Sequence, residues 1–318
     1  MWPTIVLVLL VLLLTSTVIH HLLRKREEKK NPSPGKMLTI DESKMHIYGQ
    51  GEGEPTLVFS CGAGSFSLGM YYRTFCQLAQ TTRVVLYDRF GYGWSESTNT
   101  PRTFEQINSE LMELLDKSGE KGPYVLIGHS LGAVEVFQCA QRYPEQVAGV
   151  VLLDSAHLEK KPIYYFMNAM VFYFLAFLRT AGILRLLVRL KAFDPFKDVA
   201  ETGHYPEDIM KTNLEMFYNK ICTRNSLHEL KEYYKDTDLD KQLGDMPLLV
   251  LTAEHARTKA KNYQKLVANH KHLASLSTNS VHKILPGTDH MFPVLKPDLV
   301  TEEIKLFMNS MVPASSMK

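Results

Sequence analysis

Five residues, Gly128-His129-Ser130-Leu131-Gly132, decide how this chain is interpreted. They form a G-x-S-x-G motif between an apolar run at 124–127 and a helix-like stretch at 133–142. The motif requires this strand-to-helix context, because the serine must sit on a sharp turn that pushes its hydroxyl out above a sheet. Glycines two residues to either side remove the Cβ atoms that would clash with the neighbouring strand and helix. The sequence therefore predicts a turn that presents one nucleophilic oxygen.

Short apolar segments alternate with amphipathic segments on both sides of this motif. We expect strands at 37–40, 44–48, 56–60, 83–87, 124–127, 147–153, 247–252 and 281–285, and helices at 67–80, 103–117, 133–142, 259–269 and 298–311. This alternation predicts an α/β fold with a mostly parallel central sheet and helices on both faces. Thr103 is the expected N-cap of its helix, and Gly119 lies just past the other end.

Composition excludes several classes of function. A chain of 318 residues has room for one large domain, or for a domain with an insert. The net charge of +2, without a basic stripe, argues against nucleic-acid binding. The four cysteines are widely spaced, so we expect buried thiols rather than disulfides or metal ligands. No nucleotide-binding or metal-binding motif is present, and we expect neither metal nor cofactor. His270 and His272 are expected to be solvated.

The amino-terminal segment predicts a membrane anchor at residues 1–23. Trp2 to Leu23 contains no charged residue, and about 20 such residues cross a bilayer as a helix. A secretory signal peptide is the alternative, but it would need basic residues before the apolar run and a small-residue cleavage site after it. Ile19-His20-His21-Leu22 is a poor cleavage site.

The flank of this apolar segment predicts its orientation. Arg24-Lys25-Arg26 and Lys29-Lys30 follow at once, and the positive-inside rule places them, and the chain after them, in the cytosol. Residues 24–36 are charged and contain Pro32, Pro34 and Gly35, which predicts a linker.

An insert at residues 158–243 differs in composition from the rest of the chain. It separates two parts of the predicted core domain, 37–157 and 244–311. Its stretch at 163–178 is uncharged and dense in aromatic residues, but at 16 residues it is short for a membrane span. Two interpretations can hold together. One interpretation is a helical cap that packs on the sheet domain, and the other is a lid that leans on the membrane surface or lines an acyl-binding pocket.

A serine hydroxyl is a poor nucleophile at neutral pH. It needs a histidine to take its proton and an acid to orient that histidine. Gly287-Thr288-Asp289-His290 follows the last predicted strand, in a turn opened by Pro286. We therefore expect His290 to be the base.

Three motifs together resemble the α/β-hydrolase fold, in its serine esterase or lipase-like branch. They are Gly128 to Gly132, Tyr87-Asp88-Arg89-Phe90-Gly91-Tyr92-Gly93-Trp94-Ser95, and Gly287 to His290, in that order along the chain. The resemblance covers about 37–311, with the insert in the usual cap position. One departure is Phe90, where relatives often have proline.

The resemblance implies an acid a few residues past the penultimate strand, but Ala256 stands there. Two substitutes remain open. Asp154 ends the strand at 147–153, from which some relatives take their acid, and Glu254 lies two residues nearer the penultimate strand than Ala256. The oxyanion hole needs two backbone N–H groups, which we assign to Leu131 and Ala63. Ala63 follows the strand at 56–60, in Cys61-Gly62-Ala63-Gly64, where relatives often have His-Gly.

These residues predict acyl transfer to water, with a lipophilic carboxylic ester as substrate. A monoacylglycerol, a lysophospholipid or a xenobiotic ester would suit a membrane anchor and an aromatic cap. Serine at the turn argues against epoxide hydrolase and haloalkane dehalogenase chemistry, for which relatives use aspartate. The alternatives are a peptidase or amidase on the same fold, and a catalytically silent, membrane-tethered binding protein.

Overall fold

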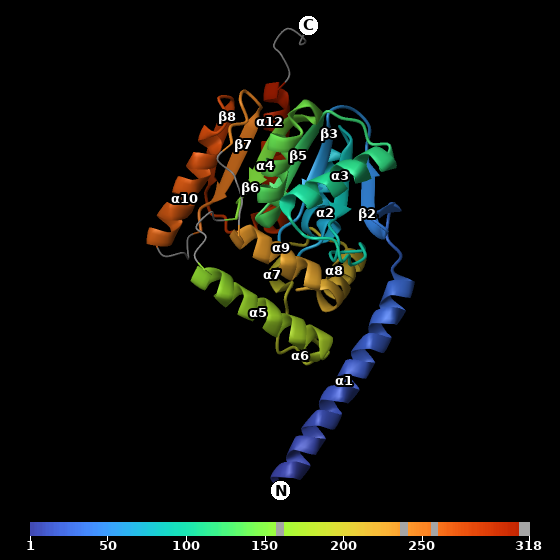
Figure 1. The fold of residues 1–318 in the computed structure, drawn as a ribbon. Coiled ribbons are helices and arrows are strands. Elements are labelled where there is room, and N and C mark those ends of the chain that lie inside the picture. The colour runs from blue at the N-terminus through green and yellow to red at the C-terminus, as the bar shows by residue number, and fades with distance from the viewer. Residues whose placement is uncertain (157–161, 236–240, 256–259, 312–318) are drawn as a thin grey trace.

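The computed structural model describes residues 1–156, 162–235, 241–255 and 260–311. An eight-stranded sheet forms the centre, in the order β1-β2-β4-β3-β5-β6-β7-β8 (Figure 1). The strands are β1 Lys36–Ile40, β2 Ser43–Gln50, β3 Thr56–Ser60, β4 Val84–Asp88, β5 Tyr124–His129, β6 Val147–Leu153, β7 Leu248–Ala253 and β8 Ser280–Leu285. β1, β2 and β4 pair antiparallel, and the pairs from β4 to β8 are parallel. The predicted fold class is confirmed.

Helices cover both faces of the sheet. α3 (Phe104–Ser118), α4 (Leu131–Arg142) and α10 (Ala260–Ser275) bury apolar side chains against one face. α2 (Ser67–Leu78), α11 (Phe292–Leu295) and α12 (Pro297–Met311) cover the other. A short 3-10 turn, Pro144–Gln146, precedes β6. Near-continuous Val, Ile and Leu in β3 to β7 match this burial on both sides.

The predicted caps of α3 are confirmed. The Thr103 hydroxyl accepts a hydrogen bond from the Gln106 amide at 3.2 Å. Gly119, just past the helix, has a φ of 81°, in the left-handed region that glycine adopts without steric cost.

The amino-terminal helix α1 (Trp2–Lys30) is long and apolar enough to cross a membrane, by length and composition. It projects away from the sheet domain (Figure 1). The helix continues through the first part of the segment 24–36 that was predicted to be a linker. Residues 24–30 are arginine, lysine and glutamate, which favour helix, and the helix ends before Pro32 and Pro34.

Five helices follow β6 and precede β7, where the insert was expected. They are α5 (Pro162–Thr180), α6 (Ile183–Arg189), α7 (Lys197–Glu201), α8 (Glu207–Lys220) and α9 (Arg224–Lys235). The large apolar side chains of α5 are mostly exposed to solvent. α5 is a second helix whose length and composition would allow a membrane span.

The expectation that His270 is solvated is wrong. His270 is fully buried, while His272 is exposed. The His270 ring lies 2.7 Å from the Thr252 hydroxyl through Nδ1 and 3.0 Å from the Ser155 carbonyl oxygen through Nε2. A histidine pattern on a helix does not show which residue faces the sheet, and here the helix packs with position 270 inward. All four cysteines are free thiols, and Cys61, Cys139 and Cys222 are buried.

Candidate active site

Ser130 lies on a strained turn between β5 and α4. Its φ of 53° and ψ of −118° fall outside the regions that a serine adopts freely. The turn depends on its glycines, because a Cβ at Gly132 would lie 2.6 Å from the Cys61 carbonyl oxygen. A Cβ at Gly128 would lie 2.6 Å from the Ala133 Cα. The backbone therefore forms the predicted sharp turn at the carboxyl edge of the sheet.

Four neighbouring strands end at this edge in residues that face one another. Ser130 follows β5, Asp154 follows β6, His255 is the second residue after β7, and His290 lies in the turn after β8. The carboxyl ends of parallel strands meet at one edge, so residues far apart in the sequence converge there.

Asp154 contacts His290 directly. Its Oδ2 lies 2.7 Å from the His290 Nδ1, and its Oδ1 accepts a hydrogen bond from the Ala253 amide at 2.9 Å. Asp154 is buried, whereas the His290 side chain is 43% exposed. Burial raises the pKa of Asp154, but hydrogen bonds from His255 and His290 outweigh burial and hold the pKa well below its ordinary range.

Glu254, the alternative acid, lies elsewhere. It is exposed, and its Oε2 accepts a hydrogen bond from the Gly287 amide at 2.7 Å. Glu254 thus holds the turn before His290 rather than the imidazole. Ala256, at the position where relatives have their aspartate, lies outside the described residues.

Ser130 and His290 line one pocket of about 590 Å³, together with Asp154, Leu131 and Ala63. Within the described part of the chain, no hydrogen bond joins the Ser130 hydroxyl to His290. Such bonds are often long in the absence of substrate and shorten when it binds. The Nδ1 of His290 is held by Asp154, so its Nε2 is the ring atom left for the pocket.

The two residues predicted to supply the oxyanion hole line the same pocket as Ser130. Leu131 is the first residue of α4, where an amide has no partner within the helix. Ala63 lies on the loop after β3 and lines the same pocket. A Cβ on the adjacent Gly62 would lie 3.2 Å from the Ser130 Cβ, so glycine is needed for this close approach.

Two further histidines belong to the site and were not predicted. His255 Nε2 lies 2.8 Å from Asp154 Oδ2, the same oxygen that contacts His290. This hydrogen bond to Asp154 raises the pKa of His255. The sequence places His255 after the penultimate strand, and that position was the only available signal.

His129, inside the G-x-S-x-G motif, supports His290 through the backbone. Its Nε2 lies 2.8 Å from the His290 carbonyl oxygen, so this nitrogen carries the hydrogen. Burial lowers the pKa of His129 to about 3, which keeps the ring neutral. No sequence pattern distinguishes this role from ordinary core packing.

Comparisons with known proteins agree with this geometry. A family model described as alpha/beta hydrolase fold matches residues 55–191. The chain has the α/β-hydrolase fold. YbdG of Bacillus subtilis (strain 168), an uncharacterized protein, is 25% identical over 302 residues, which cover 86% of this chain and 85% of that protein.

Solved structures of α/β hydrolases with different activities resemble this chain to the same degree. An esterase from Thermogutta terrifontis has a TM-score of 0.65 at 18% identity, covering 86% of this chain and 97% of its own. A variant of an epoxide hydrolase from Bacillus megaterium has a TM-score of 0.65 at 16% identity, covering 86% and 100%. At these identities the likeness shows the fold alone, and the chemistry must be argued from the site.

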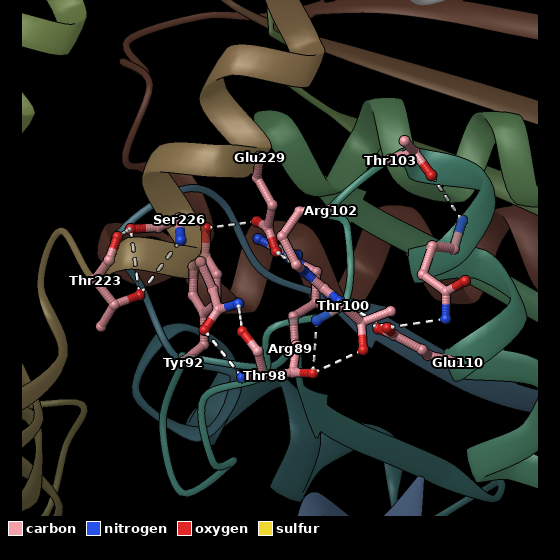
Figure 2. Close-up of polar contacts among 12 residues, drawn as sticks. Arg89, Tyr92, Thr98, Thr100, Arg102, Thr103, Glu110, Thr223, Ser226 and Glu229 are labelled. Carbon is pink, nitrogen blue, oxygen red and sulfur yellow. Dashed lines mark hydrogen bonds and ion pairs between the residues drawn. The ribbon is translucent and has the colours of Figure 1, made fainter. Parts of the chain in front are cut away.

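A buried charge cluster links the loop after β3 to the cap. Figure 2 shows its members Arg89, Tyr92 and Glu229. Arg89, from the predicted motif after β4, donates to the Cys61 carbonyl oxygen and to Glu135 of α4, each at 2.9 Å. It also bonds Glu229 of α9 at 3.2 Å, and Tyr92 donates to the same Glu229 oxygen at 2.7 Å. One guanidinium thus joins the loop before Ala63, the helix after Ser130 and the cap.

Among the described residues, Asp154, His255 and His290 could also hold a metal ion, since their ligand atoms lie within 4.8 Å of one another. Two imidazoles and a carboxylate suit several transition metals. The two imidazole nitrogens, however, already lie 2.7 and 2.8 Å from the same carboxylate oxygen. An ion would have to replace both hydrogen bonds, so the donor set as it stands fits a hydrogen-bonded carboxylate better than a ligand shell.

Proposed function

We propose that this chain is a serine hydrolase that cleaves a lipophilic carboxylic ester through Ser130, His290 and Asp154. The single observation that carries the proposal is the contact between Asp154 Oδ2 and His290 Nδ1, in a pocket that His290 shares with Ser130. An acid, an imidazole and a hydroxyl in this order form the arrangement that activates a serine.

The steps follow from the geometry. Ser130 Oγ attacks the ester carbonyl carbon while His290 takes the hydroxyl proton, and the amides of Leu131 and Ala63 stabilise the charge on the carbonyl oxygen. His290 then gives the proton to the leaving alcohol oxygen, and the C–O bond breaks to leave an acyl-enzyme. Water, activated by the same imidazole, releases the carboxylic acid and restores Ser130.

The nucleophile distinguishes this proposal from the activity of the epoxide hydrolases that share the fold. Epoxide and haloalkane chemistry in relatives uses aspartate at the turn, whereas this chain has Ser130. An acyl-enzyme on serine therefore fits the site better than an alkyl-enzyme on aspartate.

A lipophilic substrate and a membrane location are supported by helices α1 and α5. Gly182, just past the end of α5, packs on α1, because a Cβ there would lie 2.8 Å from the His20 Cβ. This contact lies within the apolar part of α1. If that part of α1 is in a bilayer, the end of α5 lies at the same depth in the bilayer as His20. Phe166 and Phe174 on α5 are about 60% exposed, while Tyr164 and Met167 of the same helix line the Ser130 pocket.

α5 is better suited to lying in the membrane interface than to crossing the bilayer. Parallel helices would appear parallel in any view, yet α5 runs across the direction of α1 in Figure 1. An amphipathic helix buries its apolar face at the boundary between headgroups and acyl chains. We place the basic flank of α1, and with it the hydrolase domain, on the cytosolic side.

Labelling with a fluorophosphonate probe tests the nucleophile. The full-length protein in detergent should be labelled, and Ser130→Ala should abolish labelling. Asp154→Asn should retain the fold and lower esterase kcat by about 10³- to 10⁴-fold, the loss typical when the orienting acid is removed. Glu254→Gln is the matched control and should stay within about threefold, because Glu254 holds a turn and not the imidazole. Labelling that persists in Ser130→Ala would refute the assignment, and an unlabelled native protein would favour a catalytically silent binding protein.

A further inference from the structure

A second cavity adjoins the Ser130 pocket and has no role in the proposal so far. Its volume is about 390 Å³, and it lies between the amino-terminal part of α2, helices α7 and α8, and α11. Its walls are mostly apolar, with Phe66, Met70, Val199, Met216, Phe217 and Val294 among them. Partly enclosed apolar spaces of this size commonly hold the apolar part of a ligand.

Two loops of the proposed site contribute neighbouring residues to the two cavities. Ala63 lines the Ser130 pocket and Gly64 lines the second cavity. In the same way His290 lines the first, and Met291 the second. A substrate held with its carbonyl oxygen at the Leu131 and Ala63 amides would therefore lie at the boundary, with one arm in each cavity.

The chemistry of the reaction determines which cavity takes the acyl part of the ester and which takes the alcohol part. His290 must reach the leaving alcohol oxygen to protonate it, and the water for the second step must reach His290 as well. His290 lines the first pocket, so the alcohol and the water belong there. The acyl chain then extends past Gly64 into the second cavity.

The cavity wall also contains one buried acceptor, which a bound water rather than an acyl chain would satisfy. Asn213 is 1% exposed, and within the described residues its Oδ1 has no hydrogen-bond partner. Leaving a buried acceptor unpaired costs roughly 1–3 kcal/mol, which a bound water would offset.

We propose that the second cavity is the acyl-chain site, and that it takes a linear chain of medium length. This rests on the proposed serine hydrolase function. A methylene group is similar in size to a water molecule, which occupies roughly 30 Å³, so 390 Å³ accommodates on the order of a dozen such groups. The preferred substrate is therefore an ester of a fatty acid of about twelve carbons, rather than an acetyl or a long-chain ester.

A series of p-nitrophenyl esters with acyl chains of 2, 4, 8, 12 and 16 carbons tests this, using full-length protein in detergent. We expect kcat/KM to peak near 12 carbons. Met216→Trp fills the cavity and should lower kcat/KM for the 12-carbon ester at least tenfold, while the 2- and 4-carbon esters stay within threefold. Met216→Ala enlarges the cavity and should move the peak toward 16 carbons.

Met167→Trp, in the wall of the other pocket, is the matched control and should leave the chain-length profile of the acyl group unchanged. Fluorophosphonate labelling of Ser130, whatever its rate, shows that each variant is folded, and Met216→Ala decides the matter if Met216→Trp fails to label. A profile unchanged in a labelled Met216 variant would overturn the acyl-chain site and leave the hydrolase assignment standing. Absence of labelling in the native protein would instead refute the hydrolase itself.

Discussion

At the scale of single residues, one carboxylate oxygen of the site lies within hydrogen-bond distance of two imidazoles. Asp154 Oδ2 contacts both His290 and His255, whose rings are stacked with centroids 6.2 Å apart. An acid that orients a base normally has one such partner, as the mechanism requires. The second imidazole fixes the carboxylate from the other side, and its charge state changes the field in which His290 works.

The raised pKa of His255 predicts the direction in which the stability of the fold changes with pH. The hydrogen bond to Asp154 is the main cause, and burial opposes it. A histidine whose pKa is raised by folding contributes stability that is fully present below about pH 6.5 and is lost as the pH rises through its folded pKa. We therefore expect the Tm difference between the native protein and His255→Gln to be larger at pH 6 than at pH 9, measured by thermal unfolding.

Glutamine at position 255 keeps an amide donor for Asp154 but cannot become a cation. At pH 9, kcat/KM of His255→Gln should stay within about threefold of the native value, whereas His255→Ala, which lacks the donor, should fall further. His272→Gln, on an exposed histidine, controls for loss of any imidazole. A Tm difference independent of pH would show that His255 does not titrate against Asp154.

Residues of the proposed site could be predicted from the sequence only where a local motif or a strand end indicated them. Ser130 was predicted from its glycines and His290 from its place after the last strand, whereas the sequence left the acid open between Asp154 and Glu254. The contact of His255 with Asp154 depends on the register of β6 against β7, with Val150 opposite Leu248, which no local pattern encodes. The burial of His270 was missed for the same reason, since it depends on how α10 is rotated against the sheet.

At the scale of elements, the cap is joined to the core by charge rather than by apolar packing alone. Glu229 of α9 is fully buried and contacts Arg89 at 3.2 Å and Arg102 at 3.6 Å. Arg102 also forms a bidentate contact with Glu110 of α3 at 2.7 and 2.8 Å. Figure 2 shows Glu229 reaching from the cap helix toward both arginines.

Removing the Glu229 charge should therefore affect both stability and catalysis. Glu229→Gln leaves two buried guanidinium groups with less compensation, and breaking a buried pair typically costs about 3–5 kcal/mol. We expect a loss of that order in the free energy of unfolding, measured with urea. A fall in kcat should accompany it, because Arg89 also holds the Cys61 carbonyl oxygen next to the oxyanion loop.

Glu232→Gln on the same helix is the matched control. Glu232 pairs with Lys235 at 2.8 Å on the surface, where such pairs contribute about 0.3–0.5 kcal/mol. If the two variants lost equal stability, the buried cluster would not be the link between cap and core.

At the scale of the whole molecule, the sheet domain and the apolar helices have separate roles. α1 extends from the body beside the cap, and α5 and α6 lie on that same side (Figure 1). Arg185 of α6 and Asn219 of α8 bond Glu27 near the end of α1, at 2.8 and 3.2 Å. The cap is thus oriented by the helix that would anchor it.

Deleting residues 2–23 should release the protein from membranes. The native chain should resist extraction with alkaline carbonate, and the deletion variant should be soluble and keep fluorophosphonate labelling. Mass spectrometry of the membrane-bound protein should find its amino terminus intact, since no small-residue cleavage site follows the apolar run. A processed terminus beginning after about residue 23 would favour a signal peptide instead.

The orientation of the cap can be tested with one tryptophan reporter at a time. Trp2 lies in the apolar segment of α1, so Trp2→Phe supplies the background and the partly buried Trp94 serves as internal reference. Phe174→Trp should then be quenched by brominated lipids in proteoliposomes, because position 174 is 60% exposed on the face that we place in the interface. Leu306 is 51% exposed on α12, a helix that covers the sheet and is not part of the cap, so Leu306→Trp should show no added quenching. Equal quenching at 174 and 306 would mean that the cap does not touch the bilayer, and that α5 owes its exposed aromatic face to something other than lipid.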